Sequence, residues 1–115
     1  MKRCYSLKRN KNFRHVYRVG KSNANKQLVL LCARSKEKRV RVGFSVSKKI
    51  GNSVVRNRVK RRLREVITPL IPMMKEGYDI IFIAREAAVD ERFSVLAASM
   101  RHLITKANLL KEQER

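Results

Sequence analysis

The segment from Asn52 to Leu70 constrains the fold more than any other, because it combines an apolar stripe with a dense run of cations. At about 100° per residue, six of its apolar side chains fall within an arc of about 120°, which predicts a helix. These side chains are Val55, Val59, Leu63, Val66, Ile67 and Leu70. Asn52 or Ser53 can cap the start of this helix, and Pro69 stops it near Thr68. Such a helix docks on a core by its stripe and leaves its cations on the two shoulders.

The polar side chains of this helix are divided between the two shoulders instead of forming one exposed ridge. One shoulder carries Asn57, Lys60, Arg61 and Arg64, with Arg56 at its edge, and the other carries Arg58 and Arg62. Guanidinium groups on both shoulders can bridge phosphates or stack on bases. An ordinary solvated helix face is the alternative. Glu65 is the only acid in the segment, so the helix lacks acidic partners of its own and favours external anions.

The whole chain carries the same positive bias. Lysine and arginine number 29 against 9 acids in 115 residues, which gives a formal charge of +20. Repulsion on this scale favours a polyanionic partner, and nucleic acid is the first choice. An anionic membrane surface would also attract the chain, but no apolar run is long enough to span a bilayer. The basic N-terminus has no apolar segment after it, so we expect a cytoplasmic protein.

Other elements are expected before this helix. Phe13, Val16 and Tyr17 lie at helical spacing in a first helix over 10–19 that stops at Gly20. An apolar run at 27–33 and an alternating run at 40–47 then predict two strands joined as an antiparallel hairpin. One face of the second strand is apolar, and the other carries only small or basic side chains. That second face is expected to stay open.

Residues 78–84 predict a third strand, and a last helix begins near Asp90. The inward side chains expected on this helix are Phe93, Leu96, Ala97, Met100, Leu103, Ile104 and Ala107. The order is therefore helix, strand, strand, helix, strand, helix, which favours one α/β layer pair. Residues 1–115 are expected to form a single domain whose end frays over 111–115.

The sequence predicts neither catalytic nor metal-binding residues in the protein. A nuclease of the two-metal kind needs several carboxylates at one point, and the nine acids are scattered along the chain. His15 and His102 are too few and too far apart in sequence to suggest an acid/base pair. Cys4 and Cys32 form no paired motif, and Cys32 is expected to be a small core residue on a strand.

Residues 46–65, with the sequence VSKKIGNSVVRNRVKRRLRE, resemble the signature of the bacterial ribonuclease P protein subunit. The likeness extends to residues 7–20 and to the strands at 41–47 and 78–85. It implies an α/β (α+β) two-layer sandwich with a central mixed four-stranded sheet, about three helices and a left-handed βαβ crossover, a ribosomal protein S5 domain 2-like fold. General topology rules would instead favour a right-handed crossover.

The resemblance also implies a function. The expected activity is that of an endoribonuclease that acts as a ribonucleoprotein and removes the 5′ leader of precursor tRNA by hydrolysis. The implied partners are the catalytic RNA of ribonuclease P and precursor tRNA, with no membrane and no obligate protein partner. Magnesium ions would be held mainly by the RNA, and the RNA would cut.

The resemblance assigns two sets of binding residues. The catalytic RNA would contact Lys48, Lys49, Arg56, Asn57, Arg58, Lys60, Arg61, Arg62 and Arg64. The leader would lie in a cleft with Phe13, Tyr17, Leu31 and Ser45. By spacing alone, Phe13 and Tyr17 fit a core equally well. Leu31 stands where the family can carry an aromatic ring, and Ser53 stands where the signature usually has alanine.

Three other classes of protein share some of these features. A ribosomal or other structural RNA-binding protein would have the same charge, size and fold class. An autonomous metal-dependent nuclease would need the carboxylate cluster that the sequence pattern lacks. A DNA-binding module is disfavoured, because no short partner helix precedes the cationic helix at helix-turn-helix spacing.

Overall fold

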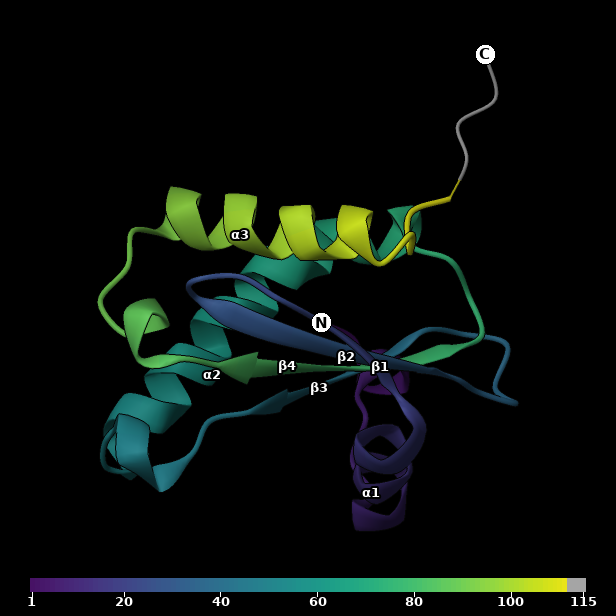
Figure 1. Cartoon of the computed structure of the whole chain (residues 1–115), viewed down its shortest axis with the longest axis horizontal. Coiled ribbons are helices and arrows are strands. Elements are labelled where there is room, and N and C mark those ends of the chain that lie inside the picture. Colours follow the sequence, from purple (N-terminus) through teal and green to yellow (C-terminus); the bar gives the residue numbers. More distant parts are fainter. Residues whose placement is uncertain (112–115) are drawn as a thin grey trace.

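The computed structural model describes residues 1–111, which build a four-stranded sheet with helices on both faces. The main elements are α1 (Asn10–Val19), β1 (Lys21–Ala24), β2 (Leu28–Arg34), β3 (Arg41–Ser45), α2 (Ser53–Ile67), β4 (Tyr78–Ala84) and α3 (Phe93–Lys106). Short 3-10 helices lie at Arg3–Tyr5, Lys48–Ile50, Thr68–Met73 and Glu86–Ala88. Figure 1 shows α3 on one side of the sheet and α1 on the other.

Local signals set the ends of α1 and α2 as the sequence predicts. The Asn52 side-chain oxygen accepts a hydrogen bond from the Val55 backbone N–H at 3.0 Å, which caps the start of α2. At the end of α1, the Gly20 N–H donates to the Val16 carbonyl at 2.7 Å. A Cβ on Gly20 would lie 2.4 Å from that carbonyl oxygen, so the close turn into β1 requires glycine.

The sheet corrects the predicted hairpin between residues 27–33 and 40–47. The strand order is β1-β2-β4-β3, so β4 lies between β2 and β3. β4 pairs antiparallel with β2 and parallel with β3. The physical reason is that β4 is apolar on both faces, with Ile80, Ile81 and Phe82 all fully buried, and such a strand belongs in the middle. The handedness of the β3–α2–β4 connection, implied by the resemblance, stays a prediction.

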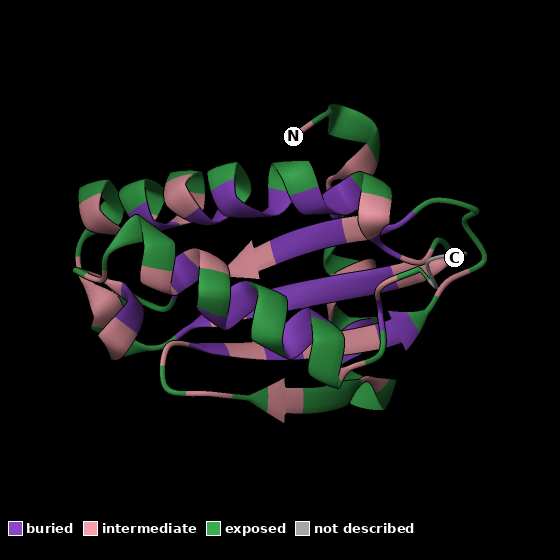
Figure 2. Cartoon of the chain, turned by 90° about the horizontal axis from the view of Figure 1, so that it is seen from above, coloured by how far each residue is buried: buried purple, intermediate pink, exposed green. Residues whose placement is uncertain are grey.

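The fourth strand is one that the residue pattern did not predict. β1 is polar and mostly exposed, and it pairs antiparallel with β2 at the edge of the sheet (Figure 2). The turn between them is held by Asn25, whose side-chain oxygen accepts from the Leu28 N–H at 3.0 Å. β1 completes the mixed four-stranded sheet that the resemblance implied. A strand without an apolar face leaves no periodic signal, which explains why periodicity missed it.

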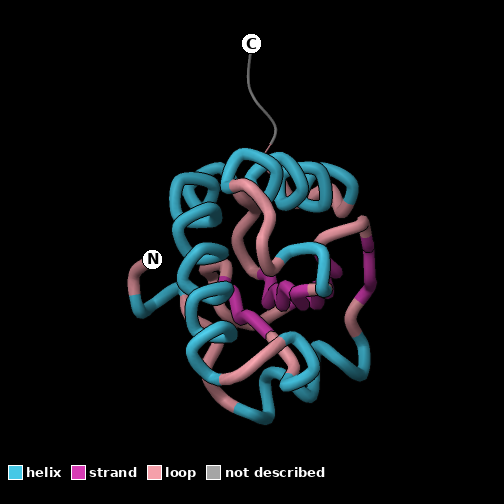
Figure 3. The backbone as a smooth tube through the Cα atoms, turned by 90° about the vertical axis from the view of Figure 1, so that its left-hand side faces the viewer, coloured by secondary structure: helices cyan, strands magenta, loops and turns pink. Residues whose placement is uncertain are grey.

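The main core lies between the sheet and the helices α2 and α3, and Figure 3 shows helical segments above, below and on one side of the strands. It is formed by residues that include Leu28, Leu30, Val42, Val59, Leu63, Ile80, Phe82, Leu96, Met100 and Leu103. The prediction that Phe93 points inward is wrong, because this first residue of α3 is 47% exposed. Lys111 is tied to the fold by its N–H, which donates to the Met73 carbonyl at 2.8 Å. The expected fraying therefore does not include Lys111, and residues 112–115 lie outside the described part.

The opposite face of the sheet carries three rows of side chains that cross β2, β4 and β3, and α1 lies over the middle row. Strand pairing aligns Ala33–Asp79–Arg41 in a first row, Leu31–Ile81–Gly43 in a second and Val29–Ile83–Ser45 in a third. α1 covers the second row, because a Cβ on Gly43 would lie 2.5 Å from Cζ of Phe13. Val16 is fully buried in the same small core as Ile81. α1 is therefore a ridge with the first row on one side and the third on the other.

Candidate nucleic-acid interface

One shoulder of α2 faces a hollow of about 360 Å³ at the edge of β3. Its lining includes three cations (Lys8, Lys60 and Arg64), two aromatic rings (Phe13 and Phe44) and no acid. The guanidinium carbon of Arg64 lies 5.9 Å from the centre of the Phe44 ring. The Phe44 ring is itself stacked on the buried ring of Phe82 at 6.3 Å between centroids. Cations beside anchored rings can bind phosphates and stack on bases.

The other shoulder of α2 is engaged within the protein. Arg62 donates a hydrogen bond from Nη2 to the backbone carbonyl of Glu91. Arg58 Nη2 lies 3.6 Å from Oδ1 of Asp90, in a pair whose side chains are 47% and 91% exposed. The sequence offered only Glu65 as a partner for this helix, but the loop before α3 supplies acceptors as well. The two shoulders, which look alike in sequence, therefore differ in how many of their donors remain for RNA.

The other residues expected to contact the catalytic RNA lie on α2 or on the 3-10 helix before it. Lys48 and Lys49 are exposed in that 3-10 helix. Asn57 and Arg61 are exposed on α2, and Arg56 is partly buried. Within residues 1–111, the buried Arg56 Nε has no hydrogen-bond partner. The predicted set therefore lies on this 3-10 helix and on both shoulders of α2.

The four residues expected to hold the leader all belong to the α1 side of the sheet. Leu31 and Ser45 are partly exposed in the second and third rows, and Tyr17 is 48% exposed on α1. Phe13 is partly buried over Gly43 and also lines the hollow of Lys60 and Arg64. Phe13 therefore packs on a small core and also lies where the two predicted binding surfaces meet.

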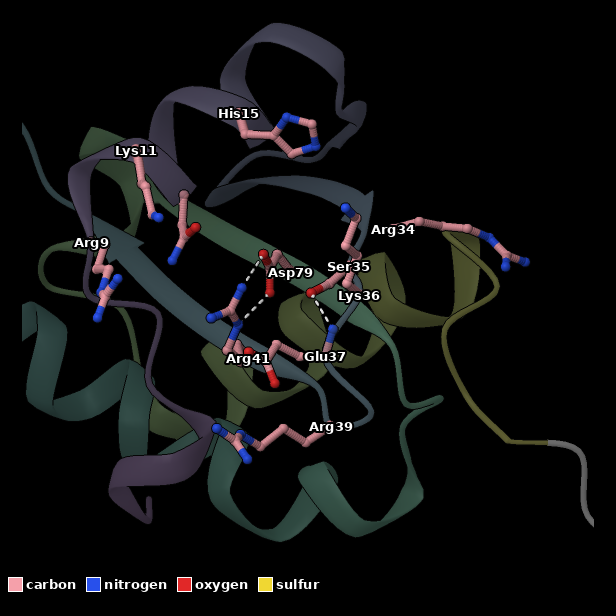
Figure 4. Close-up of a pocket in the computed structure, with 11 residues that line it drawn as sticks. Arg9, Lys11, His15, Arg34, Ser35, Lys36, Glu37, Arg39, Arg41 and Asp79 are labelled. Atoms are coloured by element: carbon pink, nitrogen blue, oxygen red, sulfur yellow. Dashed lines mark hydrogen bonds and ion pairs between the residues drawn. The ribbon is translucent and has the colours of Figure 1, made fainter.

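An ion pair that the sequence analysis missed lies in the first row. Arg41 donates from Nε and Nη2 to the two carboxylate oxygens of Asp79, each at 2.8 Å (Figure 4). Asp79 is only 4% exposed, and its hydrogen bond raises the pKa of Arg41 above the ordinary value. The available signal was the single acid inside the otherwise apolar run of β4. Such an acid is expected to be paired when it is buried.

The two cysteines differ in environment. Cys4 is exposed, whereas Cys32 is partly buried against the main core, as its position on a strand predicted. Burial raises the pKa of the Cys32 thiol, and the nearby Lys21 opposes this only in part. Cys32 is therefore protonated and poorly nucleophilic at neutral pH.

Candidate metal ligands are dispersed in the described part of the chain. Within residues 1–111, no three His, Cys, Asp or Glu side chains gather closely enough to hold a metal. The buried carboxylate of Asp79 is already bound in bidentate fashion by Arg41.

Among the described helices, none has both the length and the apolar character needed to cross a membrane.

Comparison with known proteins gives a consistent result. The family model described as Ribonuclease P matches residues 1–108. The ribonuclease P protein component of Alkaliphilus oremlandii is 44% identical over 110 residues, which cover 96% of each chain. The solved ribonuclease P protein of Staphylococcus aureus has a TM-score of 0.85 and 36% identity over 93% of this chain and 98% of its own. That of Thermotoga maritima has a TM-score of 0.80 and 25% identity, covering 88% and 96%.

Proposed function

This chain belongs to the ribonuclease P protein family, and we propose that α2 holds the catalytic RNA while the α1 side of the sheet holds the leader of precursor tRNA. The role of the family is removal of the 5′ leader, which leaves the mature 5′ end of tRNA. As a ribonuclease P protein component, the chain works together with the RNA of that ribonucleoprotein. The alternative of a ribosomal or other structural RNA-binding protein is not favoured.

The hollow between α2 and β3 is the observation that carries the first part of this proposal. Lys60 and Arg64 have no carboxylate beside them there, and the ring of Phe44 is fixed against the core. Phosphate groups that enter this hollow would release their counterions, which makes binding favourable and sensitive to salt. On the other shoulder, Arg62 has one donor already bound to the loop before α3, and Arg58 lies in an exposed, weak pair with Asp90, so both keep donors for RNA.

The second part of the proposal concerns the leader. Tyr17 offers an exposed ring, and Leu31 and Ser45 lie partly exposed on the same side of the sheet. An unpaired base can stack on an aromatic ring, which contributes roughly 1–3 kcal/mol per base. Leu31 supplies apolar contact but no stacking. Phe13 lies on α1 with Tyr17 and also lines the hollow beside α2. A leader bound on the α1 side would therefore adjoin the catalytic RNA bound at α2.

We assign the hydrolysis itself to the RNA and propose that the RNA holds most of the magnesium. The scattered acids of residues 1–111 support this assignment, since two-metal hydrolysis needs carboxylates at one point if a protein performs it. When bound, magnesium ions activate the attacking water and stabilise the leaving oxygen. The protein's part is to bind and position both RNAs. We also propose that no further protein is required and that the complex works in the cytoplasm.

The test removes two cations from the α2 hollow. The double variant Lys60→Gln/Arg64→Gln should bind the catalytic RNA more weakly, with a log–log salt slope lower by about 1.4–1.8, because each lost phosphate contact removes about 0.7–0.9. The control variant Arg101→Gln/Lys106→Gln loses the same charge from exposed positions of α3. Equal slopes in the two variants would contradict the proposal.

A reconstitution experiment tests the assignment of catalysis. Protein freed of RNA should leave precursor tRNA uncut in magnesium, and addition of the catalytic RNA should produce the mature 5′ end. Magnesium-dependent cleavage at the mature 5′ end by protein alone would contradict the assignment.

A further inference from the structure

We infer that the hollow on the other side of α1 is a second binding site for RNA phosphates, separate from α2 and from the leader surface. This inference rests on the proposed function, since it assumes that the chain binds RNA. The hollow has a volume of about 730 Å³ and lies between α1 and the loop that joins β2 to β3 (Figure 4). It is lined by Arg9, Lys11, Asn12, His15, Arg34, Ser35, Lys36, Glu37, Arg39, Arg41 and Asp79.

The floor of this hollow presents a fixed guanidinium group. Arg41 is held in place by its two hydrogen bonds to Asp79, and its side chain is 17% exposed. A guanidinium has five N–H donors. The two bonds to Asp79 are the only ones that Arg41 makes to described residues from its side chain, so three donors remain for a ligand. A planar guanidinium fixed in this way is suited to bind two non-bridging oxygens of a phosphate at once.

The rim of the hollow supplies the net charge. The lining contains six cations and two carboxylates, which leaves a formal charge of +4 with His15 neutral. Asp79 only balances Arg41, so the excess comes from the two walls. Lys11 stands on α1 and Lys36 in the β2–β3 loop, and neither makes an ion pair with another residue of the described chain.

The spread of these cations points to a phosphate chain. A small carboxylic acid would need one or two cations, whereas the rim carries exposed cations on both walls of a wide opening. A run of phosphodiesters can contact both walls at once, and each contact releases counterions. RNA backbone is the polyanion that this protein meets in its family role.

The site is distinct from the two surfaces already assigned. Arg41 and Asp79 lie in the first row of the α1 face, whereas α2 packs on the other face of the sheet. The ridge of α1 separates the first row from the third, where Ser45 lies. The phosphates bound here therefore come from another stretch of RNA, either in the catalytic RNA or in the upstream part of a long leader.

The experiment uses the double variant Lys11→Gln/Lys36→Gln, which removes one exposed cation from each wall. The control is Arg101→Gln/Lys106→Gln, with the same loss of charge. In one arm, salt slopes are measured for binding to the catalytic RNA alone. In the other, the reconstituted holoenzyme binds precursor tRNAs with short and with long leaders. We expect the slope to fall by about 1.4 in at least one arm, at about 0.7 per lost contact with single-stranded RNA.

The outcomes separate the sources and the hypotheses. A lower slope with the catalytic RNA assigns the hollow to that RNA, and a lower slope only with long leaders assigns it to the leader. Slopes equal to those of the control in both arms overturn the inference. In that case a lower salt slope for catalytic-RNA binding by Lys60→Gln/Arg64→Gln, measured alongside, would still support the proposed function. If neither double variant lowered the salt slope, the proposed function would be contradicted as well.

Discussion

The two sides of the α1 ridge use the same three strands in different ways. On one side, the row of Ala33, Asp79 and Arg41 holds a buried ion pair under a rim of cations. On the other side, Val29, Ile83 and Ser45 form a row that is partly exposed and carries no charge. One helix laid across a sheet thus produces two unlike surfaces. We expect ligand binding on the charged side to be coupled to stability through the ion pair, and binding on the uncharged side to have little effect on folding.

Removal of Asp79 should have the largest effect and tests the coupling on the charged side. Asp79→Ala leaves Arg41 uncompensated in a mostly buried position, and breaking such a pair costs about 3–5 kcal/mol of the free energy of unfolding. Urea denaturation measures this loss. Glu37→Ala removes an exposed acid from the same hollow and should change stability by less than about 0.5 kcal/mol. Equal losses of stability in Asp79→Ala and Glu37→Ala would mean that the ion pair of Arg41 and Asp79 gives the charged side no special role in stability.

A rescue variant sharpens the same point. In Arg41→Met/Asp79→Leu, both charges are replaced by apolar groups of similar size. Stability should return close to that of the unchanged protein, because a buried pair contributes little net stability compared with apolar packing. If the double variant were as unstable as Asp79→Ala, the loss would come from packing and not from an unpaired charge.

The ridge itself can be displaced by Gly43→Ala. The new Cβ would lie 2.5 Å from Cζ of Phe13, so the ring must move, and overpacking of this kind costs about 1–3 kcal/mol. Thermal or urea denaturation measures the loss. Phe13→Leu in the same background should recover part of it, because the smaller side chain relieves the contact. No recovery would show that the strain lies elsewhere than between α1 and β3.

The reactivity of the Cys32 thiol shows whether the sheet stays folded when Gly43→Ala displaces α1. Cys32 lies on β2 and packs against the core on the face away from α1. Its raised pKa means that at neutral pH it stays a thiol, and its reaction with an alkylating reagent increases only as the pH rises through that raised pKa. In Gly43→Ala, Cys4 should react readily and Cys32 slowly. Fast reaction of Cys32 would mean that the sheet had opened, and the comparison of the two sides would not apply to that variant.

The sequence predicts the helices better than the sheet, because the ends of a helix are set by nearby residues, whereas strand pairing depends on residues far apart in the chain. The cap at Asn52, the stop near Pro69 and the turn at Gly20 act within one helical turn, so α1 and α2 have the predicted limits. Strand pairing joins residues far apart. An apolar run identified β2 and alternation identified β3, but neither pattern gave a sign that β4, more than thirty residues later, would lie between them.

The candidate site shows the same limit. Helical periodicity assigned the residues of α2 to two shoulders, and the structure agrees for Lys60, Arg64, Arg58 and Arg62. Periodicity could not show that the loop before α3 would engage one shoulder only. The hollow behind α1 depends on the pairing of Arg41 with Asp79, 38 residues apart, and no local pattern predicts that contact.

The smallest effect is expected on the uncharged side of the ridge, where binding should be independent of stability. Tyr17 follows His15 by two residues, so it projects about 160° away from it around α1, on the flank opposite the charged hollow. Tyr17→Ala should weaken binding of precursor tRNA with a leader by about fivefold, or about 1 kcal/mol, the lower end for one stacked base. Binding of mature tRNA and the free energy of unfolding should change little, because Tyr17 is half exposed. Tyr17→Phe keeps the ring and should keep the affinity, whereas equal losses for mature and precursor tRNA would show that the ring supports the fold of α1 and not the leader.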